Sequence, residues 1–214
     1  MAHQPFDLTS WPRRWAFDFF KDYEQPCFNI CGDLDIGRLP EVCREGGHSF
    51  FLVSLFAAVE TVNQMAPFRL RLDGEGVRLY DRIHAGSAVL REDTSFDFCY
   101  FPFEPKLETF LQEMDQTLAC FHRREPRYDF TGQDDVLFFS VIPWISFTSF
   151  SHASTRALRS DIPRITYGKF HQRDGRFWLP LSVEVHHALM DGYHVGMYFQ
   201  TLSQKLQDLA VTLS

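Results

Sequence analysis

The chain has 214 residues, of which 45% are hydrophobic and 16% aromatic, and its formal net charge is −7. This length and apolar content fit one large core, so we expect a single domain over residues 1–214, and the acidic charge without a Lys/Arg cluster argues against nucleic-acid binding. No stretch approaches the ~20 apolar residues that span a membrane, and the first residues lack the order of a secretory signal, which predicts a soluble, cytoplasmic protein.

Two helices are predicted in the first third of the chain. Ser10 is the candidate N-cap of the first helix, Pro12 falls in its first turn, and large apolar groups repeat at helical spacing through Phe19 and Phe20. Residues 49–65 are too continuously apolar for a surface helix and too numerous for a strand. They predict a core helix buried against a sheet.

Strand signals follow on both sides of a second amphipathic helix. Two Asp-Gly dipeptides, Asp73-Gly74 and Asp174-Gly175, lie between runs of strand character and predict β-hairpins. Between them, residues 106–125 present one apolar helical stripe, and residues 136–150 begin as a buried strand that Pro143 ends.

A last helix is predicted around residues 195–209, where apolar residues again repeat at helical spacing. Strands and helices therefore alternate along the chain without repeats or a flexible linker. We expect an α/β fold, an α+β two-layer sandwich in which helices cover a mixed, largely antiparallel sheet.

The cysteines form an odd set: Cys27, Cys31, Cys43, Cys99 and Cys120. The close pair, Cys27 and Cys31, has three intervening residues where zinc and redox motifs have two. We therefore expect reduced core thiols, with a metal or disulfide role as the alternative.

The segment VEVHHALMDGYHVG, residues 183–196, ends an alternating apolar run with two adjacent histidines. The alternation predicts a strand, so His186 and His187 should face opposite sides, which disfavours a zinc site. Two interpretations then remain. His187 is either a hydrogen-bonded residue at the core rim, with Asp191 capping the next helix, or a general base beside a substrate hydroxyl.

HHALMDG resembles the His-His-x-x-x-Asp-Gly signature of the CoA-dependent acyltransferase superfamily. The segments WPRRWAFDFF, VNQM, SVIPWISFTSF, ITYGKF and DGYHVG are similar to those of chloramphenicol acetyltransferases, in the same order, over about residues 6–209. The resemblance implies O-acetylation of chloramphenicol by acetyl-CoA in a ternary complex, without a metal, and hence antibiotic resistance. It also implies a homotrimer with active sites between subunits.

The resemblance assigns roles around the histidine pair. His187 would be the general base that takes the proton of the acceptor hydroxyl, and His186 would be a supporting residue. Asp191 would form an ion pair with Arg13 that fixes the loop orienting His187. The alternative for Arg13 is a solvated charge in the first turn of a helix.

Three further polar residues receive roles by resemblance. Ser140 would donate to the oxyanion of the tetrahedral intermediate, and a hydroxyl in an apolar strand needs a partner on physical grounds as well. Thr166 would hold a water near the same intermediate, and Lys169 would approach the CoA tail. The alternatives are a serine bonded to a backbone carbonyl, a β-branched strand residue and a solvated charge.

The acceptor pocket of the family is aromatic, and the candidates here are Phe19, Phe20, Phe101, Phe103, Phe138 and Phe150. Two of them depart from the family pattern: Phe20 stands where a tyrosine is usual, and Phe138 replaces a commonly polar residue. The basic residue expected before the core helix is also missing. The same chemistry on another hydroxyl acceptor is therefore one alternative. Another is a non-catalytic trimeric assembly module, since the related dihydrolipoyl acyltransferase cores form trimers.

Overall fold

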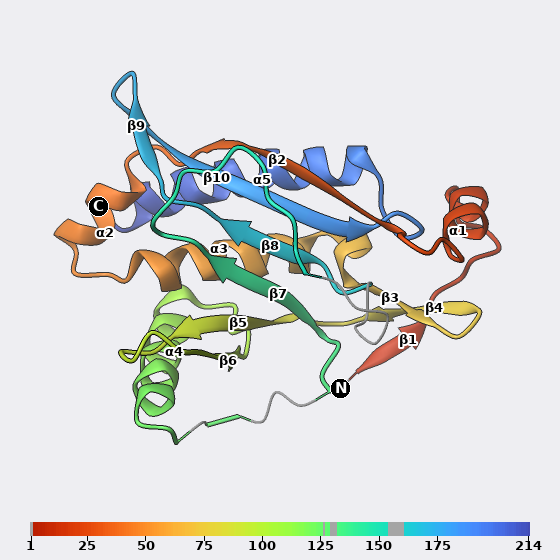
Figure 1. Ribbon diagram of the computed structural model, residues 1–214, viewed down its shortest axis with the longest axis horizontal. Coiled ribbons are helices and arrows are strands. Elements are labelled where there is room, and N and C mark those ends of the chain that lie inside the picture. Colours follow the sequence, from red (N-terminus) through yellow and green to blue (C-terminus); the bar gives the residue numbers. More distant parts are fainter. Residues whose placement is uncertain (1, 126, 129–131, 154–160) are drawn as a thin grey trace.

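The computed structural model describes the chain except residues 1, 126, 129–131 and 154–160, and the described part contains two sheets (Figure 1). The smaller sheet has the order β1-β4-β3, and the larger has the order β2-β10-β8-β7-β5-β6, with β9 paired to β10. The smaller sheet consists of β1 (His3–Pro5), β3 (Leu70–Asp73) and β4 (Gly76–Tyr80). The larger consists of β2 (Cys27–Asp35), β5 (His84–Leu90), β6 (Phe96–Phe101), β7 (Val136–Val141), β8 (Arg164–Tyr167), β9 (His171–Arg173) and β10 (Arg176–His186).

Strand direction in the larger sheet is mixed. Strand β7 pairs in parallel with β5 and β8, whereas β10 pairs antiparallel with β2, β8 and β9, and β5 pairs antiparallel with β6. This arrangement confirms the expected mixed, largely antiparallel sheet.

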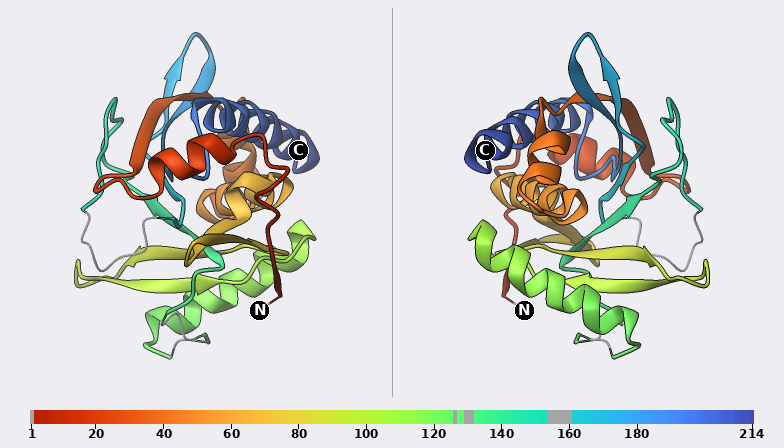
Figure 2. Two further views of the ribbon diagram at one scale, coloured as in Figure 1. Left: turned by 90° about the vertical axis from the view of Figure 1, so that its right-hand side faces the viewer. Right: turned by 90° about the vertical axis from the view of Figure 1, so that its left-hand side faces the viewer.

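Helices cover one face of this sheet. The helical elements are α1 (Arg14–Phe20), α2 (Leu39–Glu45), α3 (Phe50–Gln64), the 3₁₀ turn η1 (Ala66–Arg69), α4 (Leu107–His122) and α5 (Gly192–Thr212). Figure 2 shows α3 and α5 on one side of the sheet and the part of the chain that directly follows β7, up to residue 153, on the other. None of the helices among the described residues is both long and apolar enough to span a bilayer.

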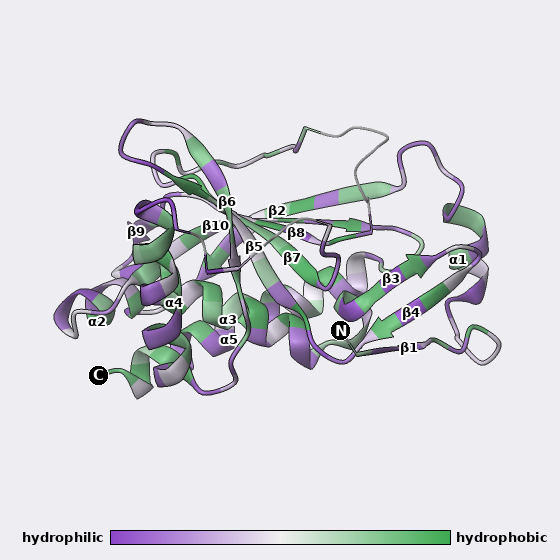
Figure 3. Cartoon of the chain, turned by 90° about the horizontal axis from the view of Figure 1, so that it is seen from below, coloured by the Kyte–Doolittle hydropathy of each residue, from purple (hydrophilic) through white to green (hydrophobic). Residues whose placement is uncertain are grey.

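The core lies between the sheet and α3, as the apolar segment at residues 49–65 predicts. Helix α3 is buried from Leu52 to Val59, and Ser49 caps its start by accepting a hydrogen bond from the Leu52 amide at 3.4 Å. Fully burying one large aliphatic or aromatic side chain stabilises a fold by about 1.5–3 kcal/mol, so this helix contributes strongly. By contrast, α4 buries one stripe, and Figure 3 shows both hydrophobic and hydrophilic residues along it.

The hairpin predictions hold, with one shift. Asp174 and Gly175 both have positive φ, 52° and 74°, and join β9 to β10 as a type I′ turn requires. In the other hairpin Asp73 is still paired, with Gly76, so the turn is centred one residue later, on Gly74 and Glu75.

The predicted cap of the first helix is wrong. Helix α1 begins at Arg14 rather than directly after Ser10. The Ser10 hydroxyl donates instead to Asp7 Oδ2 at 2.8 Å, within a turn that precedes the helix.

Candidate active site

His187 follows the last residue of β10, and the backbone holds it at two points. Its amide donates to the Pro26 carbonyl at 2.8 Å, and its Nδ1 lies 3.2 Å from the Met190 carbonyl oxygen. Because a carbonyl can only accept, this contact assigns the ring proton to Nδ1. Nε2 is then left with its lone pair, the form that a base requires.

Two phenylalanines fix the plane of the His187 ring. Phe20, in the last turn of α1, stacks on it with ring centroids 3.9 Å apart and an interplanar angle of 8°. Phe28 of β2 packs at 4.7 Å and 50°. The imidazole is therefore held between aromatic rings at the end of the sheet.

His186 lies on the other side of the sheet, as strand alternation predicts. It is 2% exposed, and its Nδ1 accepts a hydrogen bond from the Ala188 amide at 3.2 Å. Burial lowers the pKa of His186 to about 4, so the ring is neutral near pH 7. The two histidines thus occupy separate environments.

The Arg13 side chain forms hydrogen bonds both with the loop after β10 and with the residue that caps the start of α5. Its Nε donates to Asp191 Oδ2 at 3.3 Å, and its Nη2 donates to the His187 carbonyl at 3.1 Å. Asp191 is also the N-cap of α5, since its Oδ1 accepts from the Tyr193 amide at 3.0 Å. One guanidinium therefore bridges the cap of a helix and the backbone of His187.

The charge state of this bridge follows from its neighbours. Burial raises the pKa of Asp191, but His194 and Arg13 outweigh it, so the pKa of the carboxyl falls below its ordinary value. Burial also lowers the pKa of His194, which keeps that ring neutral near pH 7. Arg13 is then the cation that balances Asp191 at neutral pH.

Ser140 and Thr166 lie side by side on the face of the sheet opposite α3 and α5. Ser140 of β7 is in register with Thr166 of β8, which is in register with Ser182 of β10. Thr166 and Ser182 are fully buried; the former lies 3.4 Å from His152 Nε2, and the latter hydrogen-bonds Asn29. The Ser140 hydroxyl has no hydrogen-bond partner among the described residues and is part-exposed.

Ser140 and His187 are far apart within one chain. His187 lies five residues along the chain beyond Ser182, and Ser182 is two strands from Ser140, so strand geometry separates Ser140 and His187 by about 19 Å. The two side chains also leave opposite faces of the sheet, because His187 contacts Phe28 on the helix-covered side.

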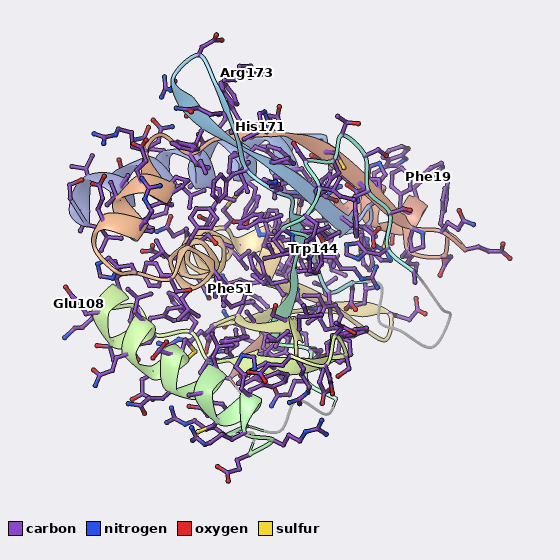
Figure 4. The ribbon with its side chains drawn as sticks, turned by 60° about the vertical axis from the view of Figure 1, so that its left-hand side comes forward. Phe19, Phe51, Glu108, Trp144, His171 and Arg173 are labelled. Atoms are coloured by element: carbon purple, nitrogen blue, oxygen red, sulfur yellow. The ribbon has the colours of Figure 1, made fainter. Side chains whose placement is uncertain are left out.

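The six candidate phenylalanines divide among three places. Phe19 and Phe20 lie on α1, where Phe19 is 48% exposed at the outer surface (Figure 4). Phe138 is on the same face as Ser140, two residues earlier in β7. Phe150 also contacts this face, since its carbonyl accepts from Asn29 at 3.3 Å.

Phe101 and Phe103 lie away from Ser140, inside the core. Phe101 is fully buried against Phe51 of α3, and Phe103 packs against Phe56. Phe101 pairs with Ala85, which places it on the helix-covered face. Phe98, in the same strand, points to the face of Ser140 and is 55% exposed, and sequence reasoning missed it.

A second missed feature is an ion pair on the Ser140 face. Arg164 Nη1 donates to Glu184 Oε1 between β8 and β10. Period-two alternation could have shown that each charge shares a face with a candidate hydroxyl residue, Arg164 with Thr166 and Glu184 with Ser182, but not that the two charges pair. Lys169, in contrast, is exposed in the loop after β8.

The cysteines are free thiols, but the prediction that all belong to the core is wrong. Cys43 and Cys99 are buried, while Cys27, Cys31 and Cys120 are partly exposed. In the part of the chain that the structure describes, no group of three or more His, Cys, Asp or Glu side chains could hold a metal ion.

Comparison with known proteins defines the class of this fold and site. A solved chloramphenicol acetyltransferase superposes with a TM-score of 0.84 at 28% identity, over 96% of this chain and all of that one. The cubic core of a pyruvate dehydrogenase complex superposes with a TM-score of 0.66 at 19% identity, over 88% and 84% of the two chains, which shows the shared fold. The protein is an acyltransferase.

The match in sequence is equally broad. Residues 1–203 match the chloramphenicol acetyltransferase family, and the chain belongs to that family. A chloramphenicol acetyltransferase of Proteus mirabilis is 28% identical over 200 residues, which cover 92% of each chain. One from Streptomyces acrimycini is 29% identical over 210 residues, covering 96% of this chain and 95% of that one.

Proposed function

We propose that the protein transfers the acetyl group of acetyl-CoA to a hydroxyl of chloramphenicol, with His187 as general base. The observation that carries the proposal is the His187 ring, whose Nδ1 faces the Met190 carbonyl and whose plane is fixed by Phe20. Chloramphenicol as the acceptor is inferred from the relatives, which are named as chloramphenicol acetyltransferases. Acetyl-CoA as the donor is inferred from the family resemblance.

The reaction follows from the lone pair on Nε2 of His187. In a ternary complex, Nε2 takes the proton of the acceptor hydroxyl as its oxygen attacks the thioester carbonyl carbon. The Ser140 hydroxyl donates to the resulting oxyanion. The C–S bond then breaks, the imidazolium returns the proton to the sulfur, and the acetyl ester and free CoA thiol leave.

The other polar residues position this centre. Arg13 and Asp191 fix the loop that carries His187, through the hydrogen bonds to the His187 carbonyl and the cap of α5. Thr166 orients a water near Ser140. Lys169 meets the CoA tail as an exposed cation.

Aromatic side chains line the acceptor site in this proposal. Phe138 lies two residues before Ser140 in β7, and Phe150 contacts the same face of the sheet at Asn29 of β2, whereas Phe20 stacks on His187 and Phe19 packs against Phe20. Phe101 and Phe103 are left out because both are in the core. A cytoplasmic location, a role in antibiotic resistance and independence from a metal stay predictions.

The complete site is formed between copies of the chain. A separation of about 19 Å is too large for Ser140 and His187 to act on one reacting carbon, so each site takes them from two subunits. Such an interface joins two different surfaces of the same chain, and repeating it around a symmetry axis gives a closed ring of subunits. The arrangement we propose is the homotrimer implied by the family resemblance.

A thiol-release assay tests the proposed function. Acetyl-CoA with chloramphenicol should release CoA thiol rapidly, and without an acceptor release should stay near background. His187→Ala should lower turnover by about 10²–10⁴, the usual contribution of a general base. Retention of near-normal turnover by this variant would disprove the assignment.

Two further outcomes separate the alternatives. Thiol release with other alcohols but not with chloramphenicol would keep the chemistry and change the acceptor. Assemblies much larger than a trimer by mass measurement, with no thiol release under any acceptor, would favour an assembly module. The likeness to the cubic core concerns the fold alone and does not favour that module.

A further inference from the structure

The Arg164–Glu184 ion pair lies on the face of the sheet that carries Ser140. The two residues are in direct register between β8 and β10, and their side chains are 8% and 14% exposed. Arg164 is also in register with Phe138 of β7, two residues before Ser140. Strand spacing then places the Cα atom of Arg164 about 8 Å from that of Ser140, a distance that a small acceptor molecule can span.

The pair is not explained by stability. Taking two charges out of water costs free energy that their attraction only partly offsets, and apolar side chains of similar volume commonly serve as well. Neighbouring positions on the other face of these strands, Ile165 and Val183, are apolar and fully buried. A function that uses the charges is therefore the better explanation.

Both partners keep unused hydrogen-bonding capacity. Arg164 donates from Nη1 to Glu184 Oε1, and no described residue accepts from its Nε or Nη2. Glu184 Oε2 likewise receives no hydrogen bond from a described residue. The pair thus offers donors on one side and an acceptor on the other, a few ångströms apart.

This combination selects a neutral group that can both donate and accept. A carboxylate would be attracted by Arg164 but repelled by Glu184. An ammonium group would be attracted by Glu184 but repelled by Arg164. A hydroxyl can donate to the carboxylate and accept from the guanidinium. The exposed ring of Phe98, on the same face, can take an apolar part of the same molecule.

We propose that Arg164 and Glu184 make the enzyme selective for acceptors that carry a second hydroxyl next to the one that is acetylated. The inference deepens the proposed function and rests on it, since the thioester carbonyl that the acceptor hydroxyl attacks must lie at Ser140. An acceptor without the second hydroxyl would leave Arg164 and Glu184 shielded from water without a hydrogen-bond partner from the substrate. Such unpaired polar groups give the strongest discrimination between similar substrates.

The test compares two acceptors that differ by one hydroxyl, 1-phenylethane-1,2-diol and 2-phenylethanol. Both present the same primary alcohol and the same ring. The native enzyme should acetylate the diol with a kcat/KM at least about tenfold higher, and the double variant R164M/E184Q should reduce that ratio to about one. Removing both charges together avoids stranding one of them, so the double variant should fold.

Matched variants separate selectivity from structure. R38M/E41Q removes a surface Arg–Glu pair at the start of α2, formed by its N-cap residue Arg38 and by Glu41, and should keep the native ratio. R164K keeps the charge beside Glu184 but loses the guanidinium donors, so it should fold even if the double variant does not, and it should lose the preference. A ratio unchanged in both Arg164 variants would assign the pair a structural role and overturn the proposal.

Binding without acetyl-CoA keeps the two proposals distinguishable. Saturation-transfer NMR of the diol should show contact with the native enzyme and a large loss in R164K, whatever the turnover. Absence of that contact, or equal binding of 2-phenylethanol, would overturn the selectivity while chloramphenicol acetylation still stands. Diol binding without thiol release from any acceptor would support the pair and disprove the transferase.

Discussion

At the scale of single residues, hydroxyl groups in one row of the sheet have different partners. Ser140 and Ser182 are separated only by Thr166 in register. Ser182 exchanges hydrogen bonds with Asn29 at 2.8 and 3.0 Å, whereas the Ser140 hydroxyl forms no hydrogen bond with a described residue. An unpaired hydroxyl on a strand is available to a substrate, and a paired one supports the fold.

This contrast predicts opposite effects of the same substitution. Ser140→Ala should lower kcat by about 10²–10³, the usual effect of losing one oxyanion donor, while the free energy of unfolding changes by less than about 0.5 kcal/mol. Ser182→Ala should remove both hydrogen bonds between the fully buried Ser182 and Asn29 and destabilise the fold by about 1–3 kcal/mol, at about 0.5–1.5 kcal/mol for each bond. Steady-state kinetics and denaturant melts measure both quantities.

A large loss of stability in Ser140→Ala would contradict this division. It would mean that the hydroxyl is bonded within the folded protein and serves the strand rather than the reaction.

At the scale of elements, strand β10 depends on the neutral form of His186. The ring accepts the Ala188 amide, and protonation of Nδ1 would remove that acceptor. Burial lowers the folded pKa of His186 from 6.5 to about 4. Between these values the unfolded chain binds more protons than the native one, so stability falls as pH falls from about 6.5 to 4.

The predicted loss is specific to this side chain. At about 1.4 kcal/mol per pKa unit, His186 accounts for at most on the order of 3 kcal/mol of unfolding free energy across that range. His186→Gln should therefore lose less stability than the native protein between pH 6.5 and 4, and the exposed His122→Gln should follow the native curve. Denaturant melts at several pH values measure the free energy of unfolding. If it fell equally with pH in His186→Gln and in the native protein, His186 would not be a buried neutral residue.

Much of the element layout was predictable because its signals are local. The turn residues Asp174 and Gly175, the apolar run of α3 and the cap Asp191 each depend on a few neighbouring residues. The faces of β6 were not predictable, since FDFCYF has apolar residues at both parities. Only pairing with β5 decides that Phe98 points to the Ser140 face and Phe101 to the core.

The proposed site rests on resemblance more than on pattern. Spacing alone placed His186 and His187 on opposite faces, but it gave no reason to join Arg13 to Asp191, which are remote in sequence. Alternation gives only the face of each residue, so the Arg164–Glu184 pair could not be predicted without the register between β8 and β10.

At the scale of the whole molecule, the two halves of the proposed centre belong to different surfaces. His187 lies beside α1, whose Trp15 and Phe19 are exposed and stacked on each other, and Ser140 lies on the far face of the sheet. Exposed stacked aromatics of this kind are typical of surfaces that contact another protein. This arrangement predicts that neither half works without a neighbouring subunit.

Mixed assemblies test that prediction directly. His187→Ala and Ser140→Ala should each be nearly inactive as pure proteins. When the two are unfolded and refolded together in equal amounts, about a quarter of the sites should combine His187 from one chain with Ser140 from the other, and thiol release should recover to that fraction. Refolding each variant with itself is the control. If both residues act within one chain, no mixture can recover activity, and the intersubunit site would be wrong even where a mass measurement finds a trimer.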